Sequence, residues 1–166
     1  MENSIKVVSI VGPTASGKTK LSVELAKHFN GEIVSADSMQ IYSGMQIATA
    51  KPTKAEMDGV PHHMMGFLPP DKTYSVASYV NDASKCIADI HSRGMLPFIV
   101  GGTGLYVDSL LNNISFSDDK RDEEYCSKLR KIGEEDGTDR LLDMLSEFDP
   151  ESAQRLRGGR NIKRII

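Results

Sequence analysis

Residues 9–22 read SIVGPTASGKTKLS and contain the spacing G-x-x-x-x-G-K-[ST] as Gly12, Gly17, Lys18 and Thr19. In loops of this kind, backbone N–H groups and the start of the next helix surround a phosphate chain. The glycines permit backbone geometry that a side chain would block, the lysine neutralises phosphate charge, and the threonine hydroxyl binds Mg²⁺. The stretch therefore predicts a phosphate site, without saying whose phosphates bind.

The segments on either side of this loop predict its structural setting. A short β-branched run over 5–11 precedes it, and apolar residues at helical spacing follow over 19–29. Further strands are expected over 32–36 and 96–100, and a long helix over 76–93 that ends at Gly94. Strands that alternate with helices predict an α/β fold of the P-loop NTPase type, in which flanking helices cover both faces of a parallel sheet.

Charge is distributed unevenly along the 166 residues, although the net charge is only −3. Residues 118–151 carry 13 acidic and 6 basic groups, whereas residues 152–166 carry 5 basic groups and no acidic group. Beyond residue 118 the pattern is helical only. We therefore expect a P-loop α/β core over 1–115, a small all-helical insertion over 116–158, and a return to the core over 159–166, where the chain stops inside a further helix.

Composition restricts the class of protein. Hydrophobic residues make up 39% of the chain and charged residues 26%, as in folded globular proteins. The apolar run near the N-terminus is too short for a signal peptide or a membrane span, which favours a cytoplasmic location without a membrane partner. Cys86 and Cys126 lack metal-site spacing and are expected to be reduced thiols. Adjacent His62 and His63 would point to opposite faces of a strand, which favours packing over a metal site.

Acidic residues give a further indication. Most P-loop NTPases have an acid at the end of a later apolar strand, where it orients the water shell of the metal. Here the strand over 96–100 ends in Gly101 and Gly102 instead, which argues against an ATP-hydrolysing motor. Asp37 follows a strand expected to lie beside the P-loop strand, at the edge where open α/β sheets bind ligands. From spacing alone, Asp37 and Ser38 could equally cap a turn.

Four blocks together resemble the tRNA dimethylallyltransferases, also called tRNA isopentenyltransferases. They are SIVGPTASGKTKLS, SADSMQIYSGMQIATAKP, GVPHHM and VGGTGLYVDSLL, in that order. The resemblance covers residues 5–112 well and 149–164 less tightly. The chain departs from the family at Cys126 and Asn161, where the family often has arginine. Members continue well past the position that matches Ile166, so the chain is expected to be an N-terminal portion, and this portion alone could be inactive.

The resemblance implies transfer of a dimethylallyl group from its diphosphate to the exocyclic amino nitrogen of the adenosine 3′ of the tRNA anticodon. Asp37 would act as general base, with Thr103 and Lys18 as further catalytic residues and Mg²⁺ bound to Thr19. The diphosphate would bind to Gly12, Pro13, Thr14, Ala15, Ser16, Gly17, Lys18 and Thr19. The tRNA would bind to Asp37, Ser38, Met39, Gln40, Thr103, Arg160, Asn161, Lys163 and Arg164. A monomer is expected.

Three alternatives remain open at this point. A P-loop kinase of a small metabolite or nucleoside would have a similar loop and fold. A prenyltransferase that acts on free adenine nucleotides would differ only in its acceptor. A truncated, non-catalytic module could bind phosphate or RNA without turnover.

Overall fold

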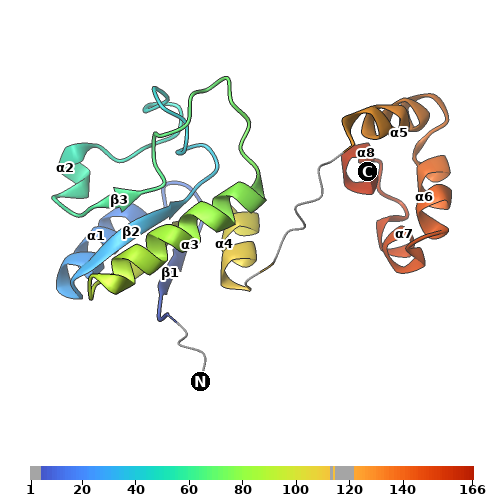
Figure 1. Cartoon of the computed structure of the whole chain (residues 1–166). Helices are drawn as coiled ribbons and strands as arrows, with labels where there is room; N and C mark the ends of the chain where they lie inside the picture. Colours follow the sequence, from blue (N-terminus) through green and yellow to red (C-terminus); the bar gives the residue numbers. More distant parts are fainter. Residues whose placement is uncertain (1–4, 113, 115–121) are drawn as a thin grey trace. The chain divides into compact units, whose positions relative to one another are not determined.

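A computed structural model describes residues 5–112, 114 and 122–166. The chain divides into two compact units, Met1–Phe116 and Ser117–Ile166, and each is described by itself. The first unit is an α/β sheet structure and the second is helical in its described residues (Figure 1).

Four parallel strands form the sheet of the first unit. They are β1 (Val8–Val11), β2 (Gly31–Ala36), β3 (His62–His63) and β4 (Leu96–Gly101), in the order β1-β4-β2-β3. The predicted parallel sheet is confirmed, but the expected neighbourhood of β1 and β2 is wrong, because β4 lies between them. The apolar run of β4 is largely buried and suits a central strand, whereas β1 alternates between half-buried and exposed residues, as an edge strand does.

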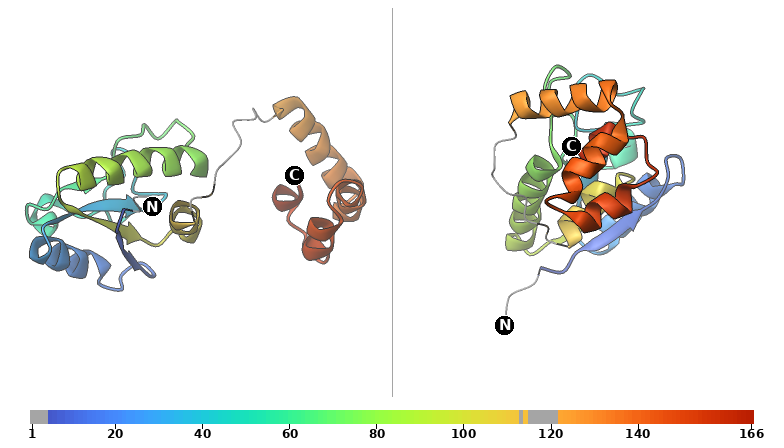
Figure 2. Two further views of the ribbon diagram at one scale, coloured as in Figure 1. Left: turned by 60° about the horizontal axis from the view of Figure 1, so that its bottom comes forward. Right: turned by 90° about the vertical axis from the view of Figure 1, so that its right-hand side faces the viewer.

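Helices cover both faces of this sheet, as predicted (Figure 2, left view). On one face, α1 (Lys18–His28) contributes Val23 to a core with Ile33 of β2 and Phe98 of β4. On the other face, α3 (Val76–Ser92) and α4 (Gly104–Leu111) pack against Val34 and Ile99. Successive residues of a strand point to opposite faces, so Ile33 and Val34 serve the two cores separately.

Local signals explain where the helices begin and end. The short helix α2 (Lys54–Met57) has a complete capping box between Thr53 and Glu56. Helix α3 begins after Ser75, whose hydroxyl accepts a hydrogen bond from the N–H of Ser78, and Gly94 follows its C-terminal cap at a φ of 73°. None of the helices in the described ranges has both the length and the apolar character that a bilayer span requires.

The second unit contains four helices in its described part: α5 (Glu123–Glu135), α6 (Thr138–Ser146), α7 (Pro150–Leu156) and α8 (Ile162–Ile165). Leu141 and Leu142 of α6 are buried, and Gly133 of α5 leaves room for Leu141 and for Ile162 of α8. Asp149 caps α7 through the N–H of Ser152, and Pro150 stands in the first turn. Residues 159–166 belong to this unit, and their return to the α/β core stays a prediction.

Candidate active site

The phosphate-loop motif connects β1 to α1, as the sequence predicted. Two of its residues have left-handed backbone conformations, Ala15 at a φ of 63° and Gly17 at 85°, and Lys18 opens the helix directly after them. The ammonium group of Lys18 donates hydrogen bonds to the carbonyl oxygen of Pro13 and, at 3.4 Å, to the hydroxyl of Ser16. The Lys18 side chain therefore folds back onto the phosphate loop, and its charge lies beside the loop backbone that would face a phosphate chain.

Hydrogen bonds connect the carboxyl ends of three strands at the same edge of the sheet. The N–H of Gly12, after β1, donates to the carbonyl of Gly101 in β4 at 3.3 Å, and the N–H of Thr103 donates to the carbonyl of Ala36 in β2 at 3.1 Å. A Cβ atom on Gly101 would lie 2.2 Å from the Ala36 carbonyl oxygen, so only glycine fits there. The phosphate loop and Asp37 thus lie at one edge, although β4 separates their strands.

Asp37 accepts two backbone hydrogen bonds through the same oxygen. Its Oδ1 accepts from the N–H of Met39 at 2.9 Å and from the N–H of Gln40 at 3.3 Å. Among the described residues no donor reaches Oδ2. The turn-capping alternative is therefore correct for one carboxylate oxygen, while the other is available to a ligand.

Ser38 and Thr103 bond to each other across the strand ends. The N–H of Ser38 donates to Oγ1 of Thr103 at 3.0 Å, and this hydroxyl donates to Oγ of Ser38 at 3.3 Å. Gln40 braces the loop that follows: its Oε1 accepts from the hydroxyl of Ser35 at 3.3 Å, and its Nε2 donates to the carbonyl of Thr49 at 3.3 Å. Met39 is half exposed.

Another brace in the same loop was not predicted from the sequence. The ammonium group of Lys51 donates to the carbonyl of Tyr42 at 2.7 Å, and burial lowers the pKa of this lysine. Together with Gln40, it fixes the segment between β2 and α2 in an irregular, hydrogen-bonded path.

A cavity of about 670 Å³ opens at this edge of the sheet. Phosphate-loop residues 14–19, Asp37 and Gln40 line it, so the structure brings these predicted site residues together. Gly12, Pro13, Ser38, Met39 and Thr103 do not line it. Ser38 directly follows Asp37, which does, and Thr103 is hydrogen-bonded to Ser38. Its remaining wall includes apolar side chains and one histidine that sequence patterns did not assign to the site: Val23, Ile33, Pro52, Ala55, His62 and Met65.

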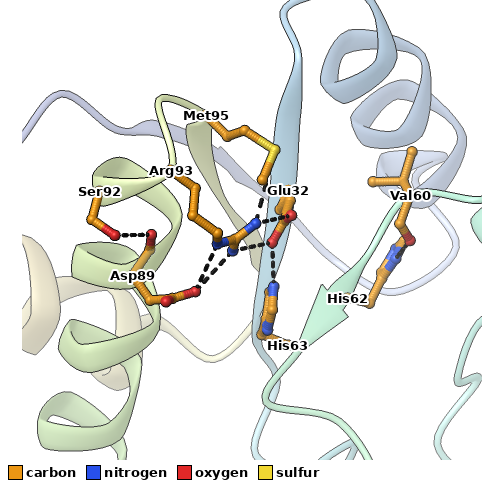
Figure 3. Close-up of polar contacts among 8 residues, drawn as sticks. All are labelled: Glu32, Val60, His62, His63, Asp89, Ser92, Arg93 and Met95. Atoms are coloured by element: carbon orange, nitrogen blue, oxygen red, sulfur yellow. Dashed lines mark hydrogen bonds and ion pairs between the residues drawn. The ribbon is translucent and has the colours of Figure 1, made fainter.

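The two histidines of β3 point to opposite faces of the sheet, as expected (Figure 3). Nδ1 of His62 donates to the carbonyl of Val60 at 2.8 Å, and Nε2 of His63 lies 2.6 Å from Oε2 of Glu32. Burial lowers the pKa of His62, and the nearby His63 lowers it further, against the opposing effect of the Val60 carbonyl. In the described ranges, no cluster of three histidine, cysteine or acidic side chains is arranged to hold a metal ion.

Glu32 is a buried acid that the sequence gave no reason to single out. Both terminal nitrogens of the Arg93 guanidinium donate to its carboxylate, at 2.6 and 2.8 Å, and Arg93 also pairs with Asp89 at 2.9 Å (Figure 3). The hydrogen bonds from Arg93, helped by His63 and opposed by burial, lower the pKa of Glu32 to about 2. Glu32 is therefore ionised across the physiological range.

The other predicted tRNA-binding residues lie in the helical unit. Arg160, Asn161 and Lys163 line a second cavity of about 390 Å³ with Arg130 and Glu134. Oδ1 of Asn161 accepts a hydrogen bond from the N–H of Lys163 at 3.1 Å and so caps α8. Arg160, Lys163 and Arg164 are all exposed.

The family model described as IPP transferase matches residues 40–166, and a model described as isopentenyl transferase matches residues 5–65. The chain is 51% identical over 163 residues to a protein of Caldanaerobacter subterraneus subsp. tengcongensis named tRNA dimethylallyltransferase. These residues cover 98% of this chain and 51% of that relative. A relative with the same name in Oceanobacillus iheyensis is 50% identical over 160 residues, which cover 96% of this chain and 51% of the relative.

Two solved structures show the same fold. A full-length tRNA isopentenylpyrophosphate transferase from Bacillus halodurans is 48% identical, with a TM-score of 0.68 over 98% of this chain and 53% of that one. A eukaryotic dimethylallyltransferase acting on tRNA is 33% identical, with a TM-score of 0.80 over 98% of this chain and 40% of that one. The chain thus spans about half the length of the curated relatives it matches.

Proposed function

The chain belongs to the IPP transferase family, and from this premise we propose that it transfers a dimethylallyl group from dimethylallyl diphosphate to tRNA. The acceptor is the exocyclic amino nitrogen of the adenosine 3′ of the anticodon, and pyrophosphate is released. The observation that carries the proposal is the cavity in which phosphate-loop residues 14–19 and Asp37 meet. The names of the relatives support the same reaction.

The phosphate loop serves as the leaving-group site in this reaction. The bond between the allylic carbon and the diphosphate oxygen breaks, and negative charge builds up on the departing oxygen. Backbone N–H groups of the loop and the ammonium group of Lys18 stabilise that charge. Lys18 already lies against the loop at Pro13 and Ser16, so it requires only a change of hydrogen-bond partners to reach the diphosphate.

Mg²⁺ fits the donors at this site. The hydroxyl of Thr19 and the carboxylate of Asp37 line the same cavity, and Mg²⁺ is usually held by one or two protein oxygens together with phosphate oxygens and waters. We propose that Thr19 holds it. When bound, the ion would neutralise charge on the pyrophosphate.

Asp37 is the proposed general base. The exocyclic nitrogen of adenine is a poor nucleophile because its lone pair is delocalised into the ring. As the new nitrogen–carbon bond forms, the nitrogen loses a proton, and Oδ2 of Asp37 is the oxygen available to accept it. Oδ1 meanwhile keeps its bonds to the N–H groups of Met39 and Gln40, which fix the direction of the carboxylate.

Single-stranded loops present their bases for this kind of chemistry at a cost of about a few kcal/mol for extrusion. Ser38, Met39 and Thr103 are the proposed contacts with the target nucleotide. The basic residues Arg160, Lys163 and Arg164 are proposed to bind tRNA phosphates, with Asn161 at the start of their helix.

The direct test uses the purified chain with dimethylallyl diphosphate, Mg²⁺ and unmodified tRNA. Mass spectrometry of the digested tRNA should show one adenosine heavier by one dimethylallyl group. AMP in place of tRNA tests the free-nucleotide acceptor, and ATP with candidate metabolites tests phosphoryl transfer. Phosphoryl transfer without binding of dimethylallyl diphosphate would overturn the proposal in favour of a kinase.

A further inference from the structure

Strand β3 is only two residues long and pairs with one neighbour. His62 lies opposite Ile33 and His63 opposite Val34 in β2. A strand this short at the edge of a sheet gains few ladder hydrogen bonds, such as that from the N–H of Ile33 to the carbonyl of Pro61 at 3.0 Å, so side-chain contacts add to what holds it. The two histidines hold it from opposite faces of the sheet (Figure 3).

On one face, His63 is anchored to a carboxylate whose oxygens are both in use. Oε1 of Glu32 accepts from Arg93 at 2.6 Å, and Oε2 accepts from Arg93 at 2.8 Å and from His63 at 2.6 Å. The Glu32 side chain is only 5% exposed, so water does not replace these partners easily. The anchor therefore ties β3 to β2 and, through Arg93, to the segment that follows α3.

On the other face, His62 forms part of the cavity wall. The Val60 carbonyl can only accept, so Nδ1 of His62 carries the proton that makes their 2.8 Å hydrogen bond. Among the described residues no group bonds to Nε2 of His62. The apolar residues Val23, Ile33 and Met65 line the same cavity, as do the acidic residues Glu24, Glu56 and Asp58.

We propose that Glu32 and His63 are positioning residues for the ligand site. By fixing β3 from the far face of the sheet, they fix His62 and the adjoining apolar wall, which packs against the dimethylallyl group of the diphosphate substrate. Neither residue touches the ligand. The inference rests on the proposed function for the identity of the ligand, but the positioning itself concerns this chain alone.

The residues that line the cavity support a role for His62 in binding the apolar part of the ligand. A prenyl diphosphate has a charged head and a branched apolar tail, and the cavity lining includes, besides the phosphate loop and several charged residues, the apolar residues Val23, Ile33 and Met65. A neutral imidazole in that wall accommodates an apolar group more readily than an imidazolium, because an imidazolium would lose hydration on contact with it. Inorganic diphosphate, in contrast, needs the loop alone.

The test compares two ligands on matched variants by calorimetry. His63→Leu removes the donor to Glu32, and His63→Gln supplies an amide donor near the position of Nε2. Asp89→Asn is the control, because Asp89 also pairs with Arg93 but, among the described residues, has no hydrogen bond or ion pair to β3. We expect His63→Leu to weaken dimethylallyl diphosphate binding on the order of 10-fold, with inorganic diphosphate affinity unchanged. His63→Gln should recover most of the loss, and Asp89→Asn should resemble the unmodified chain.

Glu32→Gln provides a second variant, with a side chain of nearly the same shape, if His63→Leu does not fold. It too should bind dimethylallyl diphosphate more weakly and inorganic diphosphate with unchanged affinity. If the unmodified chain binds dimethylallyl diphosphate more tightly than diphosphate, variants that keep its affinities for both ligands, or that lose affinity for both ligands equally, would overturn the positioning role.

A ligand-free readout separates this inference from the proposed function. Side-chain NMR of the histidines should show His62 with its proton on Nδ1, and that signal should shift in His63→Leu but not in Asp89→Asn. A shift in a chain that does not prefer dimethylallyl diphosphate over diphosphate would leave positioning standing and contradict the proposed function. An unmoved His62 signal would contradict the positioning role, whatever the ligand preference.

Discussion

The backbone N–H of Ser38 donates a hydrogen bond to Oγ1 of Thr103 at 3.0 Å, although 65 positions separate the two residues along the chain. The same threonine bonds through its own N–H to the carbonyl of Ala36. Two strand ends, after β2 and after β4, are therefore held together by one side chain and one peptide group, directly beside Asp37.

Thr103→Ala is expected to loosen this connection. The N–H of Ser38 loses its acceptor, which should lower the free energy of unfolding by about 1 kcal/mol. The turn that carries Asp37 then loses one of its supports, so prenyl transfer should fall more than stability alone explains. Thr103→Ser keeps the hydroxyl and is the matched control. Urea unfolding and transfer rates of both variants check this, and equal rates for Thr103→Ala and the unmodified chain would remove Thr103 from the site.

Asp37→Asn separates the two roles of this residue. An asparagine oxygen still accepts from the N–H groups of Met39 and Gln40, so the turn should persist and thermal stability should hardly change. The amide cannot accept a proton from adenosine, so transfer should fall by about 10²- to 10⁴-fold. Single-turnover rates measured beside diphosphate affinity test this. A variant that transfers at the normal rate would show that Asp37 is only a turn cap.

The sequence predicted the parallel sheet, the phosphate loop and the position of Asp37 because these depend on local patterns. Apolar runs, glycine spacing and capping residues such as Thr53 act within a few positions along the chain. The strand order was not predictable in the same way, since pairing of β4 with both β1 and β2 depends on contacts between distant segments. The expected pairing of β1 with β2 failed for that reason.

The site shows the same division. Motifs in the sequence pointed to residues 14–19 and Asp37, which line the cavity. They did not point to His62, which also lines it, or to the buried ion pair of Glu32. A lone glutamate at the start of an apolar strand has no sequence signature for burial. Its partner Arg93 lies 61 positions away, at a helix end where arginine is ordinary.

The stability of the chain should depend on pH through Glu32. Its pKa is lowered from 4.5 to about 2 in the folded state, chiefly by the hydrogen bonds from Arg93. A depressed folded-state pKa contributes stability above the unfolded-state value, and this contribution is lost as the pH falls from about 4.5 towards 2. The loss should amount to about 3 kcal/mol. Urea unfolding at several pH values should show a shallower decline for Glu32→Gln, and parallel curves for the two proteins would contradict the prediction.

Gly101 and Gly104 provide a matched pair in the turn after β4. A Cβ atom on Gly101 would lie 2.2 Å from the carbonyl oxygen of Ala36, whereas one on Gly104 would meet nothing within 4 Å. Gly101→Ala must therefore push β4 away from β2 and should cost about 1–3 kcal/mol, as overpacking does. Gly104→Ala lies in the first turn of α4, without a positive φ, and should stabilise the chain by about 0.5–1 kcal/mol. Thermal unfolding of the two variants should show a lower midpoint temperature for Gly101→Ala and a higher one for Gly104→Ala. If Gly101→Ala were as stable as the unmodified chain, the strand ends could move apart freely, and the close approach that brings Asp37 to the phosphate loop would not be a requirement of the fold.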